Sequence, residues 1–109
     1  MAEAPKSLGQ SLPAAYTLTD LFAVPAAKST VVASILVCNQ STGPIRFRIA
    51  HAVGAAVDAR AQYLFFDEVV QANKTYTAVL GISGVAGDVI RVYSSSPEVS
   101  FNAYGVEIG

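Results

Sequence analysis

The feature that most restricts the fold of this chain is an alternation of apolar and polar residues with a period of two. The run Ile45-Arg-Phe-Arg-Ile49 places three apolar side chains on one face and two arginines on the other. This is the pattern of a strand with one buried face. Residues 75–82 alternate in the same way, and no window of twelve residues shows a helical stripe. The alternation therefore predicts an all-β chain.

Turn sequences rich in Gly, Pro, Asn and Ser separate about eight such runs. The runs are clear at residues 29–38, 44–49, 62–70, 75–82, 88–93 and 99–107, and weaker at 7–10 and 16–24. Short strands at this spacing predict a single antiparallel β-sandwich of the jelly-roll or Greek-key type. We expect its core to contain Val31, Ala33, Ile35, Phe47, Ile49, Leu80, Ile90, Val92 and Phe101.

The chain is divided into an arm and a domain in this interpretation. At 109 residues it has room for one core. Pro5, Gly9 and Pro13 disfavour a helix or a central strand. We therefore predict an extended N-terminal arm at residues 1–15 and a β-sandwich domain at residues 16–109. The arm is expected to become ordered only by adding to a neighbouring subunit or to a larger shell.

The composition suggests that part of the surface is covered by another protein. Hydrophobic residues make up 52% of the chain and charged residues only 14%, against roughly 25% charged in an average soluble domain. The run at 62–70 is apolar on both faces, which predicts a strand buried once by its own sandwich and once by something else. The run at 99–107 is also apolar on both faces, which a bulge near Ala103 or a subunit interface would explain. The interface is predicted to contain Leu8, Leu12, Tyr63, Phe65, Tyr104 and Val106.

No residue pattern in the chain is typical of catalysis, of a cofactor site or of a metal site. His51 is the only histidine, and the nearest acids in sequence, Asp58 and Asp67, lie beyond a loop. Asp67 and Glu68 are adjacent in a strand and are expected to point to opposite faces. Cys38 stands alone in an apolar strand and is interpreted as a small buried residue. We therefore predict a protein that binds and assembles and is not an enzyme.

Three glycines at 81, 84 and 87 resemble a phosphate-binding loop only superficially. Such a loop needs a helix after it, and here another strand pattern follows. We expect these glycines to supply positive φ angles in a hairpin connection. No basic stripe suited to nucleic acid and no apolar run long enough to span a membrane is present. The first twelve residues lack the pattern of a secretory signal, so the chain is expected to stay where it is made.

Several longer segments resemble a known kind of protein. They are Ser7-Leu-Gly-Gln-Ser11, the run from Thr17 to Ala27, the run from Val31 to Asn39, Phe47-Arg-Ile49, Gln62-Tyr-Leu-Phe-Phe-Asp67, Gly87-Asp-Val-Ile-Arg-Val-Tyr93 and the run from Val99 to Gly105. Together they are similar to small β-sandwich virion proteins of tailed bacteriophages, and the similarity extends over nearly the whole chain. These are strand and turn motifs, so they carry over no catalytic residue.

The resemblance implies a virion structural protein made in the host cytoplasm. The preferred interpretation is a capsid decoration (cement) protein, a homotrimer on the capsid surface whose partners are other copies and the major capsid protein. The alternative is a tail, fibre or baseplate component that contacts the host surface through loops such as residues 54–60. A cellular carbohydrate-binding sandwich is disfavoured because the chain has no Trp and no acidic metal-binding cluster.

Overall fold

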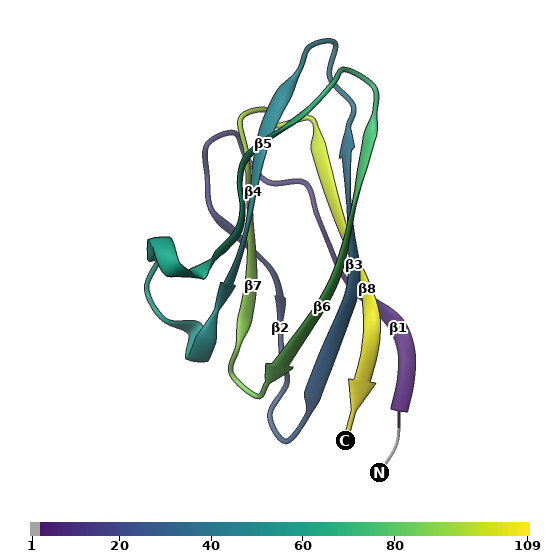
Figure 1. The fold of residues 1–109 in the computed structure, drawn as a ribbon, viewed down its shortest axis with the longest axis vertical. Helices are drawn as coiled ribbons and strands as arrows, with labels where there is room; N and C mark the ends of the chain where they lie inside the picture. The colour runs from purple at the N-terminus through teal and green to yellow at the C-terminus, as the bar shows by residue number, and fades with distance from the viewer. Residues whose placement is uncertain (1–2) are drawn as a thin grey trace.

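The structure is a computed structural model that describes residues 3–109, with side chains described from residue 5 onward. It contains eight strands and two short 3-10 helices, η1 and η2 (Figure 1). The elements in chain order are β1 (Glu3–Ser11), β2 (Thr19–Ala23), β3 (Ser29–Asn39), β4 (Ile45–Ala52), η1 (Val53–Ala55), η2 (Arg60–Gln62), β5 (Tyr63–Val70), β6 (Thr75–Val85), β7 (Val89–Ser94) and β8 (Val99–Ile108).

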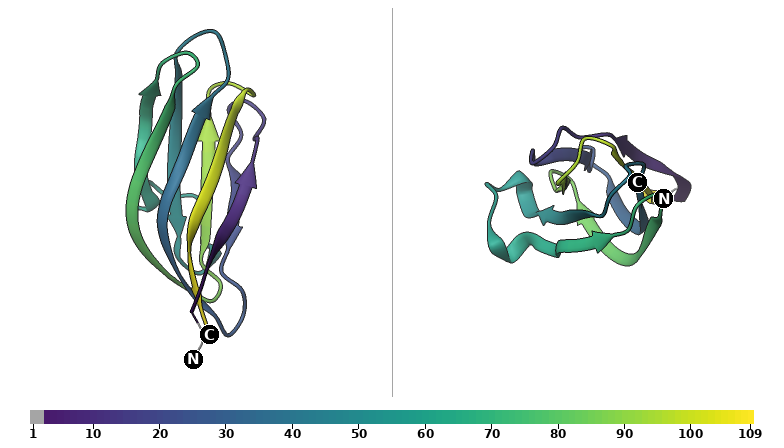
Figure 2. Two further views of the ribbon diagram at one scale, coloured as in Figure 1. Left: turned by 90° about the vertical axis from the view of Figure 1, so that its right-hand side faces the viewer. Right: turned by 90° about the horizontal axis from the view of Figure 1, so that it is seen from above.

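The strands form two four-stranded antiparallel sheets that pack face to face (Figure 2). One sheet has the order β1-β8-β3-β6 and the other the order β2-β7-β4-β5. Only the β4–β5 connection stays within one sheet, while every other connection crosses to the opposite sheet. This strand order is that of the eight-stranded jelly roll. The predicted all-β antiparallel sandwich of about eight strands is therefore confirmed.

The core lies between the sheets and is centred on aromatic and branched side chains. Phe47 of β4 is fully buried, and its ring centroid lies 5.4 Å from that of Tyr76, 5.8 Å from that of Phe65 and 6.3 Å from that of Phe101. Because Tyr76 and Phe101 belong to the other sheet, Phe47 joins the two layers. The predicted core residues found fully buried or nearly so are Ile35, Phe47, Ile49, Ile90, Val92 and Phe101, and Leu80 packs against them partly buried.

Two predicted core positions in β3 are wrong. Val31 is only half-buried and Ala33 is exposed, whereas Val32 is buried. The register of β3 with both neighbouring strands shifts between Val32 and Ser34. A β-bulge at this point reverses the alternation, so the inward residues are even-numbered before it and odd-numbered after it. Because both faces of this strand are largely apolar, the sequence pattern alone did not reveal the change.

Strand β1, at the edge of the same sheet, also has an irregular register close to the bulge in β3. The register between β1 and β8 shifts between Ser7 and Gly9. In β8, a Cβ atom added to Gly105 would overlap the Val31 carbonyl oxygen and approach Leu8 Cδ1 to 3.0 Å. Glycine at this position therefore permits a close approach of three strands that any side chain would prevent.

The segment predicted to be an arm has a partner other than the one expected. Residues 3–11 are extended, as predicted, but they form edge strand β1 and pair with β8 of the same chain from Glu3–Ile108 to Ser11–Phe101. Leu8 packs against the core of its own subunit. Proline is tolerated in an edge strand, which explains Pro5 in β1. Residues 1 and 2 of the predicted arm lie outside the described residues.

At each end of the sandwich, a buried polar side chain forms hydrogen bonds to the backbone of the neighbouring connections. At one end, the Asn39 side-chain amide donates to the carbonyl oxygens of Gly43, Val70 and Gln71 at 2.9–3.1 Å, and its Oδ1 accepts from Ser41. At the other end, the Asp88 carboxylate accepts hydrogen bonds from loop backbone groups, as described below. Fully bonded buried groups of this kind fix loop conformation because an unpaired partner would be costly.

Candidate functional site

The six predicted interface residues do not form one surface. Leu8 and Phe65 both pack against the core of their own subunit. Tyr63 is half-buried, and its hydroxyl donates to Asp58 Oδ1 at 2.7 Å. The apolar side chains that β5 presents to solvent are instead Leu64, Phe66 and Val69, which are 46%, 58% and 38% exposed.

The remaining three predicted interface residues are accessible. Leu12 lies in the β1–β2 connection and is 62% exposed. Tyr104 is 40% exposed and Val106 is half-buried, and both lie on the outer side of β8. Two of the six residues therefore share one sheet face. Their role as an interface stays a prediction.

The outer face of the β1-β8-β3-β6 sheet carries no charged side chain among residues 5–109. Register places Ser7, Tyr104, Ser34 and Val79 in one row across the four strands. The same alternation turns Lys6 and Glu107 to the inner side, where they form an ion pair at 3.4 Å. We call this surface the uncharged face; its members are Pro5, Ser7, Gln10, Ser29, Val31, Ala33, Ser34, Leu36, Cys38, Thr75, Thr77, Val79, Ser83, Val85, Ser100, Asn102, Tyr104, Val106 and Ile108.

The opposite sheet has a chemically different exterior. Arg48 of β4 pairs with Asp67 of β5 through two hydrogen bonds of 2.7 and 3.3 Å. Arg91 of β7 pairs with Asp20 of β2 at 3.2 Å and also donates to the Ala56 carbonyl oxygen at 2.8 Å. The two outer faces of the sandwich thus differ sharply, one being uncharged and the other carrying a set of ion pairs.

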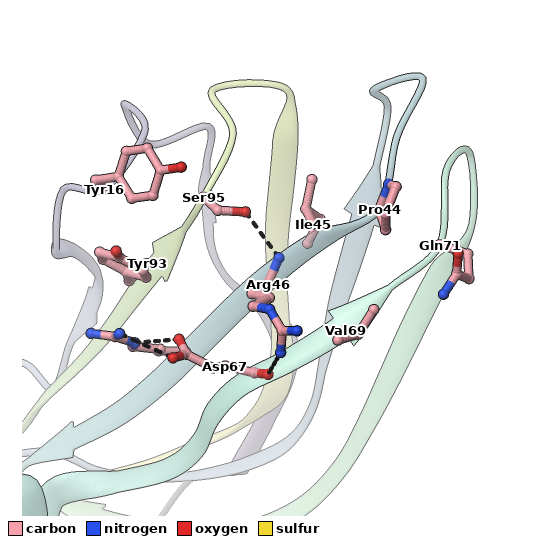
Figure 3. Close-up of a pocket in the computed structure, with 10 residues that line it drawn as sticks. Tyr16, Pro44, Ile45, Arg46, Asp67, Val69, Gln71, Tyr93 and Ser95 are labelled. Atoms are coloured by element: carbon pink, nitrogen blue, oxygen red, sulfur yellow. Dashed lines mark hydrogen bonds and ion pairs between the residues drawn. The ribbon is translucent and has the colours of Figure 1, made fainter.

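A groove of about 540 Å³ lies on this charged exterior (Figure 3). Its lining comes from β4, β5, β7 and the connections beside them, and consists of Tyr16, Pro44, Ile45, Arg46, Arg48, Asp67, Val69, Gln71, Tyr93 and Ser95. Figure 3 shows Arg46 in the middle, with Tyr16 and Tyr93 to one side and Val69 and Gln71 to the other. The volume falls within the range of small-molecule sites, roughly 300–1,000 Å³.

Aromatic rings and an aspartate hold Arg48 in place at the groove. Its guanidinium carbon lies 4.0 Å from the ring centroid of Phe66 and 4.3 Å from that of Tyr93. Asp67 has φ 56°, a left-handed conformation, at a register shift between β4 and β5. This bulge presents its carboxylate to Arg48. The arginine is therefore fixed by stacking and by a bidentate ion pair together.

Tyr16 is the second non-glycine residue in a left-handed conformation at the groove. Its φ is 57°, and its backbone N–H donates to the Ser94 carbonyl oxygen at 2.8 Å. Its ring stands edge-on to Tyr93 with 6.2 Å between centroids, yet the residue is 70% exposed. A tyrosine in this region of φ carries backbone strain, and such residues cluster at binding sites.

The groove has an excess of positive charge. The hydrogen bond from Arg48 holds the pKa of Asp67 below its usual value, and the nearby charge of Arg46 acts in the same direction. The same hydrogen bond raises the pKa of Arg48. Arg46 has no ion-pair partner among residues 5–109, and its guanidinium donates only to the Asp67 carbonyl oxygen, at 3.2 Å. Two arginines and one aspartate therefore leave one net positive charge.

His51 has a carboxylate partner that its neighbours in sequence did not indicate. Its Nε2 lies 3.0 Å from Asp88 Oδ2, a residue at the β6–β7 turn. The same carboxylate accepts from the backbone N–H groups of Gly54, at 2.9 Å, and Val85, at 3.2 Å. These bonds lower the pKa of Asp88, with the Gly54 N–H as the largest cause. The arrangement joins two loops and β4, and no hydroxyl or thiol is hydrogen-bonded to His51 among the described side chains.

Two expectations about single residues need correction. Cys38 is half-buried and lies on the uncharged face, not in the core. Of the three glycines, Gly87 has a positive φ, 93°, whereas Gly84 is buried where a Cβ would lie 3.0 Å from Val24 Cγ2. The turn that holds Gly87 joins β6 and β7, which belong to different sheets, so it is not a hairpin.

No protein-family model matches the chain, and no curated protein matches its sequence. Among the described residues, no three His, Cys, Asp or Glu side chains are grouped so as to hold a metal ion. The described part of the chain also contains no helix with the length and apolarity needed to cross a membrane.

The sequence prediction missed the groove. The alternation had placed Arg46 and Arg48 on the outer face of one strand, which is a partial signal for a charged surface. The contributions of Tyr16, Asp67 and Tyr93 depend on two left-handed residues and on strands far apart in sequence. No local pattern in the chain indicates either.

Proposed function

We propose that this protein is a structural component of a tailed-phage virion, most specifically a capsid decoration protein that assembles with copies of itself and binds the head. The observation that carries the proposal is the uncharged face. It spans four strands and contains exposed apolar side chains, including Val79, Val85 and Tyr104 at 81%, 62% and 40% exposure. The resemblance described above supplies the virion context.

A surface of this composition suits protein–protein contact. The central parts of interfaces are depleted of charged residues, since a charge buried without a partner is costly. Ser and Thr side chains can exchange water for hydrogen bonds across the contact. A protein that binds only the assembled shell stabilises that shell by mass action, without any chemistry.

The projected area of the uncharged face is of the same order as the area that a subunit interface buries on each partner. Strand β8 has 10 residues. At about 3.3 Å per residue and about 4.8 Å between strands, four strands of this length cover roughly 600 Å² in projection. A standard interface buries about 800 Å² per partner. We infer that this face meets other copies in a homotrimer, and that the trimer binds the major capsid protein.

The test of assembly compares two exposed valines. Val79 lies on the uncharged face and is 81% exposed, whereas Val57 lies in the β4–β5 loop and is 87% exposed. Sedimentation of the wild type at tens of micromolar should show an oligomer. The dissociation constant of the V79K oligomer should be at least tenfold higher than that of the wild type, and the dissociation constant of V57K should equal that of the wild type. A monomeric wild type, or a V79K protein that assembles as tightly as the wild type, would contradict the proposed interface.

A second experiment separates the head from the tail. The groove favours the alternative, a tail or fibre component that contacts the host surface, because a built recognition site would be useful there. Quantitative mass spectrometry of purified virions gives the number of copies per particle. Hundreds of copies support decoration of the head, and a few or a few dozen support the tail. Complete absence from virions would refute both.

A further inference from the structure

We propose that the groove on the β2-β7-β4-β5 sheet binds a saccharide that carries a carboxylate, that is, a sugar acid of the uronic or sialic class. The proposal goes beyond the decoration function and rests on no part of it. It derives from the chemistry of three groups that face the groove: an arginine without an acidic partner, a pair of tyrosine rings and a fixed carboxylate.

Arg46 supplies the site for the carboxylate. It is exposed, and four of its five guanidinium N–H groups have no recorded acceptor among the described residues. A planar guanidinium binds a carboxylate through two parallel hydrogen bonds. The groove holds only one net positive charge, so a singly charged carboxylate matches it better than a doubly charged phosphate.

The tyrosines supply the surface for a sugar ring. Tyr16 is held beside Tyr93 by its backbone bond to Ser94 despite a strained φ. The exposed ring of Tyr16 offers an apolar surface on which the C–H groups of a saccharide can stack. The left-handed φ belongs to a turn in which the Thr17 N–H donates to the Ala14 carbonyl oxygen at 3.3 Å. This turn places the Tyr16 ring at the groove with most of its surface exposed, where a ligand can contact it.

The remaining polar groups match hydroxyls. The Asp67 carboxylate is fixed by Arg48 yet keeps unused lone pairs, which can accept from sugar hydroxyls. Ser95 Oγ accepts from the Arg46 backbone N–H, so its own proton remains available to donate. Gln71 lines the far side, and its side-chain amide has no hydrogen bond recorded within the described residues. A ring with several hydroxyls and one carboxylate would use all of these groups.

The experiment titrates the isotopically labelled full-length protein and follows its amide resonances by NMR. The probes are D-glucuronate and N-acetylneuraminate, with D-glucose, acetate and inorganic phosphate as comparisons. We expect at least one sugar acid to bind with a Kd on the order of 1 mM or tighter, as is reasonable for an open groove. The shifts should be confined to residues around Tyr16, Arg46 and Tyr93.

Variants show whether binding uses the proposed groups. R46Q should weaken binding of the sugar acid at least tenfold, and Y16A should weaken it through loss of the ring. R60Q removes an exposed arginine from η2, outside the groove, and should leave binding unchanged. Amide spectra of each variant report whether it is folded, and Y16A provides an independent test if R46Q is not.

Four outcomes would overturn the proposal. They are the absence of any shift at the groove with either sugar acid, unchanged binding in both R46Q and Y16A, equal affinity for acetate or phosphate, and equal affinity for glucose. The third outcome would indicate a simple anion site, and the fourth a neutral-sugar site. None of them bears on the oligomer or on the copy number per virion, so failure here is distinguishable from failure of the decoration proposal.

Discussion

Replacement of Phe47 by alanine should be among the most destabilising single changes in this protein. The side chain is fully buried, and three aromatic rings lie within 6.3 Å of its ring, two of them in the opposite sheet. Removing it leaves a cavity that the two sheets cannot close without shifting relative to each other. Phe→Ala changes at such sites cost about 3–5 kcal/mol. The aromatic contacts, worth about 0.5–1.5 kcal/mol each beyond area, favour the upper half of that range.

The magnitude is large relative to the stability of a small domain, which is about 5–15 kcal/mol. Near the melting temperature, 1 kcal/mol corresponds to about 4–8 °C for a domain close to this size. A loss of about 4 kcal/mol should therefore lower the Tm by roughly 15–30 °C. Urea denaturation followed by far-UV circular dichroism measures the free energy of unfolding directly, provided that the slope with denaturant is unchanged.

Phe66 provides the matched control for this experiment. It is 58% exposed on the other side of the same sheet and contacts Arg48 and Tyr63. Loss of an exposed cation–π contact costs about 0.5–1 kcal/mol. The reasoning is refuted if F47A costs less than about 1 kcal/mol, or if F47A and F66A are equally destabilised.

Three further predictions concern polar and backbone features. Folding lowers the pKa of Asp88, so the ionised carboxylate stabilises the folded state at pH values above its unfolded pKa, 3.8. This stabilisation is lost as the pH falls through the pKa of the folded state. D88N should therefore lose less stability than the wild type between pH 5 and pH 2 in urea titrations. G105A should destabilise by about 1–3 kcal/mol because the new Cβ overlaps the Val31 carbonyl oxygen, while G81A, with no atom within 4 Å of its Cβ, should not. Deletion of residues 1–11 removes β1 and exposes the edge of β8, so the truncated chain should aggregate or lose its cooperative thermal transition.

The sheet period and the turn residues were sufficient to predict the sandwich, because each strand has to bury one face regardless of its partners. The errors occurred where the backbone departs from regular pleating. Ala33 was assigned to the core because alternation was continued through a bulge that neither face of β3 reveals. In a strand that is apolar on both faces, the sequence does not show which residues point inward, so the position of a bulge cannot be located from it.

Contacts between distant residues were the second source of error. His51 was considered with acids close in sequence, whereas its partner Asp88 is 37 residues away and reaches it only through the packing of the two sheets. The groove depends in the same way on β4, β5 and β7, and on the left-handed φ of Tyr16, a residue type that seldom adopts it. Local sequence contains no signal for such an arrangement.

The segregation of charge between the two outer faces has a consequence for how the protein would be oriented in an assembly. In a jelly roll the two exteriors point in opposite directions, so a copy that buries the uncharged face necessarily turns the β2-β7-β4-β5 exterior away from that contact. In a cyclic trimer the uncharged face of one copy meets a different surface of the next copy, so the groove with Arg46 and the two tyrosines stays open where that second surface is not the β2-β7-β4-β5 exterior. Three grooves held in one particle would bind a repeating acidic polymer with greater avidity than any single groove. Assembly through one face and recognition through the other are thus compatible in a single small domain.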